Sequence, residues 1–340
     1  MSRAQRKISH INEVVKQTQF EPSSFDEMDI IHQSLTPLNW DQLSLETKCG
    51  ELSLRSPLFI NAMTGGGGFK TTEINQKLAI AAHEKDLAIA VGSQMSALKD
   101  EEEKNTYEVV RREHPNGTVI ANIGTEATVN QALRAIDMLE ANALQIHLNV
   151  MQELIMPEGD RDFSDRLQNI EQIIKNVSIP VIIKEVGFGI SKETALKLKN
   201  IGVEYIDVGG RGGTSFSKIE NNRREDRLQS LNNWGIPTLV SLKEVQAAYP
   251  SAHLIASGGI RHGLDGVKAM ISGANMFGMA GPMLRTLVDE EVEGLLKKID
   301  SIHDEIKIVM MTLGVSKPSE LKGRPHVLFG KTKDWINQRL

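Results

Sequence analysis

The 340-residue chain is poor in cysteine and aromatic residues: it has one cysteine, Cys49, and 4% Phe, Trp and Tyr. One cysteine excludes an internal disulfide framework and a metal site built from cysteine alone. No run reaches the roughly 18 uninterrupted apolar residues that a membrane-spanning helix needs. The basic start MSRAQRKISH is followed by no apolar stretch, so it is not a secretory signal. We therefore expect a soluble, cytoplasmic protein with no membrane partner.

The chain also lacks a strong charge of either sign. Its formal net charge is −5, which gives no general field favouring nucleic acid. With 40% hydrophobic and 24% charged residues it can form both a packed core and a solvated surface, which excludes disorder and collagen-like repetition. The length fits one (β/α)8 barrel or two ordinary α/β domains.

Eight short apolar runs, many of them rich in β-branched residues, are separated by stretches with helical spacing. The runs cover 57–63, 87–93, 118–124, 144–150, 180–187, 205–210, 253–260 and 275–281. Strands that alternate with helices at roughly thirty residues per unit are typical of parallel βαβ architecture. Their near-continuous apolarity indicates strands covered on both faces. Eight such units favour a (β/α)8 TIM barrel over an open sheet.

The whole chain, 1–340, is predicted to form one domain. Residues 1–50 form a mostly polar N-terminal arm, 55–285 the barrel, and 289–340 a C-terminal helical segment whose long closing helix ends at Gly314. The stretch after Pro237 is ambiguous, and its apolar spacing of three favours a helix over a ninth strand.

In such barrels the chemistry lies at the carboxyl ends of the strands. The first three strands end in the glycine run Met63–Phe69, in Ser93 and in Asn122. Glycines let main-chain N–H groups approach a ring or an anion closely, and the polar side chains can bind a heterocycle edge. A flexible loop tip and ordinary helix caps explain the same residues equally well.

The later strands end in a lysine and in glycine pairs. Lys184 interrupts the apolar fifth strand, so it must reach the barrel mouth or a partner carboxylate. Glycines follow the sixth, seventh and eighth strands at 209–213, 258–259 and 281. In this fold, such glycines and a helix N-terminus bind phosphate. Together they predict a phosphate-bearing cofactor.

The fourth strand runs into the most polar segment, from His147 to Phe163, with Gln152 and Glu153 near its start. Glu153 could ligate Mg²⁺, which takes few protein carboxylates; a surface carboxylate and a core histidine are the plain alternatives. No set of ligands has zinc spacing. In the arm, Arg6, Lys7 and His10 suit a diphosphate, or else form a solvated tail.

At this point the motifs resemble those of a known family, the type 2 isopentenyl-diphosphate Δ-isomerases. The matching segments are residues 6–10, 61–66, 145–153, 156–163, 180–189, 210–216 and 257–261. The segment after the fourth strand separates this family from other FMN barrels. One departure is Gly209, where many relatives have serine, so a hydroxyl contact to FMN is absent.

The resemblance implies a role for each matching residue. FMN is expected at Met63, Thr64, Gly65, Ser93, Asn122, Lys184, Thr214, Gly258, Gly259, Ile260, Arg261, Ala280 and Gly281. Substrate is expected at Arg6, Lys7, His10 and Gln152, and Mg²⁺ at Glu153. Gln152, Lys184 and His147 are the expected catalytic residues.

The implied activity is the interconversion of isopentenyl and dimethylallyl diphosphate in isoprenoid biosynthesis, in a homo-oligomer (a tetramer or octamer). It uses reduced FMN, with NADPH or NADH as the reductant. Two alternatives stay open. An FMN-dependent oxidoreductase of a hydroxy acid or nucleotide would use an arginine and a histidine near the sixth or seventh strand, or a loop cysteine. Arg261 and His262 are a faint version of the first, and Cys49 lies before the first strand, which is wrong for the second. A non-catalytic phospholigand barrel would leave Gln152 and Glu153 unexplained.

Overall fold

A computed structural model describes residue 13, residues 23–62 and residues 64–340. Eight parallel strands close into a barrel in chain order, with the last strand pairing the first. They are β4 (Leu58–Ile60), β5 (Ala88–Ala90), β6 (Val119–Gly124), β7 (Ala143–Leu148), β8 (Val181–Glu185), β9 (Tyr205–Asp207), β10 (His253–Ser257) and β11 (Met276–Met279). The predicted (β/α)8 barrel is confirmed.

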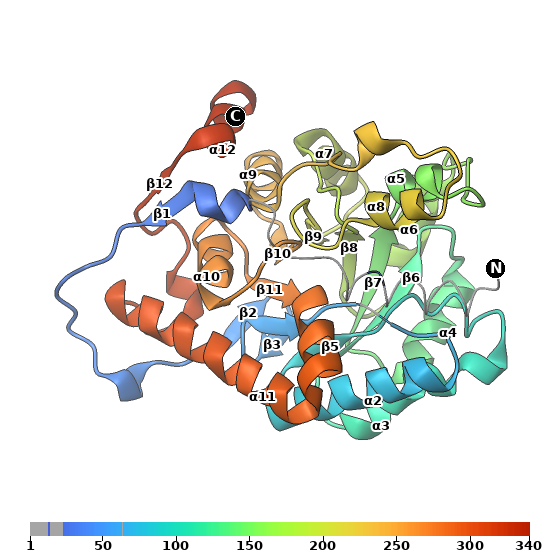
Figure 1. Cartoon of the computed structure of the whole chain (residues 1–340), viewed down its shortest axis with the longest axis horizontal. Coiled ribbons are helices and arrows are strands. Elements are labelled where there is room, and N and C mark those ends of the chain that lie inside the picture. The colour runs from blue at the N-terminus through green and yellow to red at the C-terminus, as the bar shows by residue number, and fades with distance from the viewer. Residues whose placement is uncertain (1–12, 14–22, 63) are drawn as a thin grey trace.

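Helices surround the barrel (Figure 1). They are α2 (Phe69–Glu84), α3 (Asn105–Glu113), α4 (Val129–Leu139), α5 (Val150–Ile155), α6 (Arg166–Asn176), α7 (Lys192–Asn200), α8 (Phe216–Asn222), α9 (Thr238–Ala248), α10 (Gly263–Ile271), α11 (Gly281–Thr312) and α12 (Gly330–Arg339). The ambiguous stretch after Pro237 is helix α9, as its spacing indicated.

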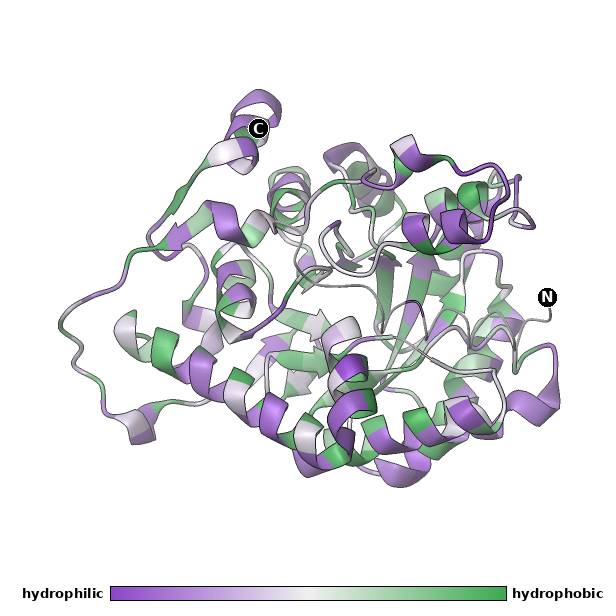
Figure 2. Ribbon diagram, viewed as in Figure 1, coloured by the Kyte–Doolittle hydropathy of each residue, from purple (hydrophilic) through white to green (hydrophobic). Residues whose placement is uncertain are grey.

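Local sequence explains where the outer helices begin and which face they bury. In α4, the Thr128 hydroxyl accepts from the Gln131 N–H, and the Gln131 side chain accepts from the Thr128 N–H. This capping box satisfies two backbone donors at the helix start. Residues Ala132, Ala135 and Leu139 then bury one face against the barrel. Figure 2 shows apolar strands inside and mixed outer helices.

The barrel interior is closed at its amino end by a hairpin of β2 (Thr47–Cys49) and β3 (Leu52–Leu54). Cys49, Leu52 and Leu54 are buried in one apolar cluster with side chains from inside the barrel, Phe59 and Ile182 among them. We expected a mostly polar arm here. Strands of three residues carry too little periodicity to be recognised in a sequence.

The two ends of the described chain pair with each other, since β1 (Met28–Ile30) is antiparallel to β12 (His326–Leu328). The predicted closing helix is α11, which begins earlier than expected, at Gly281, and is broken by a positive φ at Glu291. The remaining short elements are the 3-10 turns η1 (Ser24–Glu27), η2 (Trp40–Gln42), η3 (Glu101–Glu103), η4 (Gln229–Leu231) and η5 (Pro318–Glu320).

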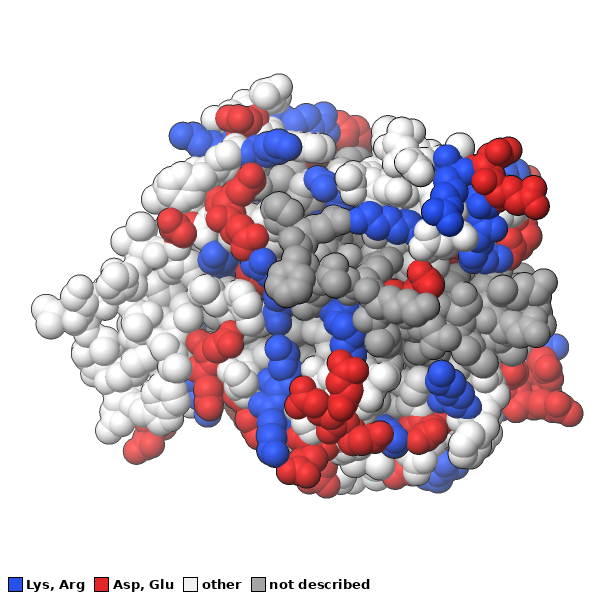
Figure 3. Space-filling view, in the orientation of Figure 1, with Lys and Arg blue, Asp and Glu red and all other residues white. Residues whose placement is uncertain are grey.

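On the described surface visible in Figure 3, lysine and arginine side chains are interspersed with acidic ones. Within the described ranges, no helix combines the length and apolarity needed to cross a membrane.

Candidate active site

A pocket opens at the carboxyl ends of the barrel strands, where β4, β8, β9, β10 and β11 run into their loops. Seven of the predicted cofactor residues line it: Lys184, Thr214, Gly258, Gly259, Ile260, Ala280 and Gly281. The structure therefore brings together residues that are almost one hundred positions apart in the sequence.

The floor of the pocket is made of backbone because two glycine loops pack directly on each other. A Cβ atom at Gly258 would lie 2.0 Å from the Gly210 carbonyl oxygen, and one at Gly213 would lie 2.8 Å from the Gly259 nitrogen. Side chains here would push the loops apart. The surface suits a flat ring and an anion that approach main-chain groups closely.

Gly209 is the position at which we expected a departure from the family pattern. Its φ is +44°, and a Cβ atom would lie 1.9 Å from the Glu185 carbonyl oxygen. A serine at this position would require the ends of β8 and β9 to move. Glycine is therefore required by the backbone that this chain adopts.

Three cationic side chains line the pocket. Lys184 is only 9% exposed, and its Nζ donates to the Glu185 carbonyl oxygen at 2.8 Å. Lys218 and Arg285 were missed by the sequence analysis. Burial lowers the pKa of Arg285. The position of Arg285, one turn into the helix that starts at the last strand end, is the signal that could have revealed it.

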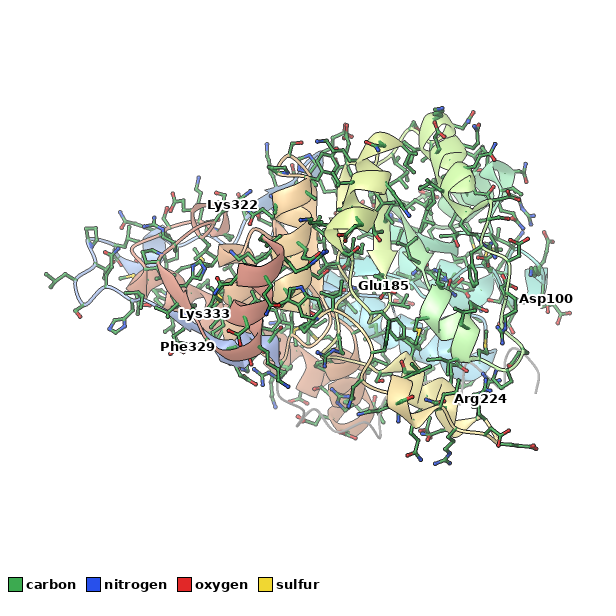
Figure 4. The ribbon with its side chains drawn as sticks, turned by 90° about the horizontal axis from the view of Figure 1, so that it is seen from above. Asp100, Glu185, Arg224, Lys322, Phe329 and Lys333 are labelled. Carbon is green, nitrogen blue, oxygen red and sulfur yellow. The ribbon has the colours of Figure 1, made fainter. Side chains whose placement is uncertain are left out.

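Glu185 organises the loop after β8 and lies among the barrel strands near the middle of the molecule, whereas Asp100 lies at its edge (Figure 4). One carboxylate oxygen accepts from the N–H groups of residues 186–188 at 2.6, 2.8 and 2.5 Å. Burial raises the pKa of Glu185 to about 8, against the opposing effect of these N–H groups and of Lys184. The carboxyl group thus shapes a loop whose first residues line the pocket.

The residues predicted from the first strands lie outside the pocket lining. The Thr64 hydroxyl is buried against Asn75, and the Ser93 carbonyl accepts from the Tyr107 hydroxyl. At Gly65, φ is +147° and a Cβ atom would lie 2.1 Å from the Tyr107 ring. These contacts hold the loop after β4 against α2 and α3, and the loop after β5 against α3. The predicted FMN contacts of these residues stay predictions.

His147 and Asn122 are adjacent across β6 and β7. The His147 Nδ1 lies 2.9 Å from the Asn122 Oδ1, and because an amide oxygen only accepts, this hydrogen bond places a proton on Nδ1. Asn122 is 3% exposed. The pairing fixes the orientation of the imidazole ring.

Gln152 on α5 is held by a carboxylate that the sequence analysis missed. Its Nε2 donates to the Glu220 Oε1 at 3.2 Å, and Glu220 is fully buried on α8. Arg223 forms an ion pair with the other oxygen of Glu220. The bond fixes which end of the Gln152 amide faces the strand ends. Nothing in the sequence links residues 152 and 220.

Glu153 was predicted as the magnesium ligand. Its two oxygens accept from the Asn149 Nδ2 at 2.8 Å and from the Asp160 N–H at 2.9 Å. In the described part of the chain, no three His, Cys, Asp or Glu side chains cluster as a metal site. A single carboxylate fits Mg²⁺ only if water and phosphate oxygens supply most of the ligands.

Four predicted residues, Arg6, Lys7, His10 and Met63, lie outside the described residues. Arg261 is described, but it does not line the pocket. Its guanidinium binds Asp265 and Asp26. The ring of the next residue, His262, accepts from the Asp265 N–H at 3.2 Å and caps α10.

Comparison with known proteins identifies the family. A family model described as FMN-dependent dehydrogenase matches residues 79–327. An isopentenyl-diphosphate delta-isomerase of Geobacillus sp. (strain WCH70) is 52% identical, over 100% of this chain and 97% of that protein. That of Bacillus pumilus (strain SAFR-032) is 48% identical, over 100% and 96%. The chain belongs to the FMN-dependent isopentenyl-diphosphate delta-isomerase family.

Solved structures of the same fold are more distant relatives of this isomerase-family chain. A mandelate oxidase has 16% sequence identity and a TM-score of 0.67, over 96% of this chain and 98% of that chain. A mutant flavocytochrome b2 with pyruvate bound has 18% identity and a TM-score of 0.69, over 93% and 78%. At such identity the likeness establishes the barrel fold alone.

Proposed function

We propose that this protein interconverts isopentenyl diphosphate and dimethylallyl diphosphate by a 1,3-proton shift. It does so with reduced FMN in the pocket, Mg²⁺ on the diphosphate, and NADPH or NADH as the reductant of the flavin. The observation that carries the proposal is the 48–52% identity, over the full chain, to proteins named isopentenyl-diphosphate delta-isomerase. We also propose that the protein is a cytoplasmic homo-oligomer.

The residues of the pocket fit FMN. The glycine floor accepts a flat ring, and Lys184 provides a positive charge beside it. The loop Gly258–Ile260, the start of α11 and Arg285 supply N–H groups and charge for a phosphate. When bound in reduced form, FMN supplies an electron-rich ring that stabilises positive charge and exchanges protons.

The substrate would lie over this ring, between α5 and the arm. Gln152, oriented by Glu220, and His147, oriented by Asn122, are not among the lining residues of the pocket, and they are the candidates that hold or move a proton. Glu153 would hold Mg²⁺ through one oxygen. Glu13, the first described residue of the arm, accepts from the Asn222 Nδ2 on α8 at 3.2 Å. This contact supports an arm that approaches the substrate side of the pocket.

The hydroxy-acid oxidoreductase is the other candidate, because the matching family model is described as FMN-dependent dehydrogenase. That reaction needs an arginine for the substrate carboxylate and a histidine as base. The Arg261 guanidinium is bound to two aspartates, and the His262 Nδ1 accepts from the backbone of α10. Neither residue lines the pocket, which supports the isomerase.

An anaerobic assay with FMN, Mg²⁺ and isopentenyl diphosphate tests the proposal. The isomerisation has no net redox change, so NADPH should be oxidised once to reduce the flavin but not in proportion to product, and photoreduction should replace it. We expect many molecules of dimethylallyl diphosphate per NADPH oxidised. Oxidation of one nicotinamide per turnover would instead identify an oxidoreductase.

A further inference from the structure

Asp207 is a fully buried carboxylate directly behind the pocket lining. Its Oδ1 accepts from the Ser257 hydroxyl at 2.7 Å and from the Gly209 N–H at 3.2 Å, and its Oδ2 accepts from the Asn61 Nδ2 at 3.1 Å. Ser257, Gly209 and Asn61 all line the pocket, while Asp207 does not. One carboxylate therefore holds three pocket-lining groups from three different strand ends.

The Asp207 carboxylate also lies beside Lys184, one of the cationic residues that line the pocket. Asp207 on β9 and Lys184 on β8 are register partners in a parallel pair, so their side chains point to the same face of the sheet. That face is the barrel interior, because Asp207 accepts hydrogen bonds from Asn61 at the end of β4 and from Ser257 on β10. Burial raises the pKa of Asp207 above its usual value, against the opposing effects of the Lys184 charge and of the hydrogen bonds from Ser257, Gly209 and Asn61.

A further buried side chain, Gln145 on β7, extends this hydrogen-bond network away from Lys184. The Gln145 Nε2 donates to the Asn61 Oδ1 at 3.3 Å, and Gln145 is fully buried on β7. Because Asn61 receives this bond on its oxygen, its amide nitrogen is directed at Asp207. The chain of bonds fits a carboxylate acceptor at 207 and orients the side chain of Asn61 toward it.

We propose that Asp207 is a positioning residue that sets the reduction potential of the flavin in this pocket. It offsets the charge of Lys184 and fixes Asn61 and Ser257 behind the ring. The inference rests on the proposed FMN pocket. In a low-dielectric interior, an unopposed Lys184 would stabilise negative charge on a reduced flavin. Asp207 opposes this effect and keeps the reduced ring electron-rich, as stabilisation of a carbocation requires.

The test is the midpoint potential of FMN bound to the whole protein, measured without substrate. Asp207→Asn keeps the size of the side chain and removes its charge. We expect the ratio of reduced to oxidised flavin at a fixed potential to rise at least tenfold, which is about 30 mV for a two-electron couple. Ser257→Ala removes one of the hydrogen bonds to Asp207 without changing the charge, so it measures the part of the effect that comes from position alone. Glu244→Gln removes a buried carboxylate on α9 that does not line the pocket, and this control should leave the potential within a threefold change in that ratio.

If the midpoint potential of FMN is the same in Asp207→Asn as in Ser257→Ala, Asp207 has a structural role only and the inference is wrong. If Asp207→Asn does not fold, the double variant Lys184→Gln/Asp207→Asn decides. Recovery of a folded, yellow protein supports the charge pairing, and failure of the double variant overturns it. A protein that binds FMN but does not isomerise would overturn the proposed function and leave this measurement valid.

Discussion

Arg261 donates to both carboxylate oxygens of Asp26, at 3.1 and 2.5 Å, across 235 positions of sequence. The same guanidinium donates to Asp265 at the start of α10. Next to this fork, the Lys268 Nζ donates to the Phe25 carbonyl oxygen at 2.8 Å. These bonds fasten the turn η1, where the N-terminal arm meets the barrel, to the loop after β10 that lines the pocket.

Asp26→Asn should therefore destabilise the protein at neutral pH. The hydrogen bond from Arg261 lowers the pKa of Asp26 despite partial burial. A lowered pKa contributes stability above the unfolded value of 3.8, which is lost as the pH falls through the folded value. Because the Asp26 side chain is 47% exposed, we expect about 1 kcal/mol or less.

Thermal melts at pH 7 and at a series of acidic pH values measure this effect, and the difference between the two proteins should shrink as the pH falls below 3.8. Asp29→Asn, on the neighbouring strand β1, is the matched control, since the Asp29 side chain is exposed. An equal loss in both variants at pH 7 would mean that the fork with Arg261 contributes nothing specific.

The strands of the barrel could be predicted because parallel strands buried on both faces are continuously apolar, and all six residues of β6 are buried. The glycine pairs at 209–210 and 258–259 could be predicted because close packing of two loops excludes side chains. Both signals are local, and each is visible within a few residues.

The contacts that complete the site could not be predicted, because they join distant residues of ordinary type. In the sequence, nothing distinguishes Glu220 and Asp207 from other acidic residues of helices and strand ends. Only the closed barrel places Glu220 beside Gln152, and Asp207 beside Lys184. The pair of Asp26 and Arg261 depends in the same way on where the arm crosses the barrel. The hairpin β2–β3 is too short to show a period.

The C-terminal helix α12 is fastened to the barrel by one buried acid, Glu244 on α9. It accepts from the Arg339 Nε at 2.9 Å, from the Trp335 Nε1 at 2.8 Å and from the Lys192 N–H at 2.9 Å. Burial acts to raise the pKa of Glu244, but these hydrogen bonds together lower it to about 2. The ionised carboxylate is thus stabilised in the folded state.

Glu244→Gln should lower the free energy of unfolding by about 3 kcal/mol at pH 7, because the pKa of Glu244 is near 4.3 in the unfolded chain and about 2 in the folded protein. The difference from the unchanged protein should shrink between about pH 5 and pH 2, because the stability of a depressed carboxyl is lost in acid. Urea titrations, with Trp335 fluorescence, measure it. Glu193→Gln removes an exposed partner of the same arginine and should cost below about 1 kcal/mol.

Glu153→Gln tests the proposed metal site. It removes one charge and keeps a side chain of the same size beside Asn149 and Asp160. Activity should fall by at least tenfold and the Mg²⁺ concentration for half-maximal activity should rise, since the metal then depends on water and phosphate oxygens. FMN content should not change. An unaltered Mg²⁺ dependence would show that the metal binds elsewhere.

The N-terminal arm carries the last prediction. Arg6 and Lys7 precede Glu13, whose carboxylate accepts from Asn222 on α8, beside the pair of Gln152 and Glu220. An arm so placed can reach a diphosphate on the far side of the pocket from the glycine floor, and it can exclude water from a carbocation-like state. Charge-assisted hydrogen bonds contribute about 1.5–3 kcal/mol each.

Arg6→Ala and Lys7→Ala should therefore raise the Michaelis constant for isopentenyl diphosphate roughly tenfold or more and leave flavin occupancy intact. Deletion of residues 1–10 should nearly abolish activity in a protein that still folds and stays yellow. Lys16→Ala, a basic residue of the same arm beyond Glu13, is the control and should change the constant less than threefold. Full activity after the deletion would show that the arm is a solvated tail, because a segment that binds the diphosphate cannot be removed without loss of substrate affinity.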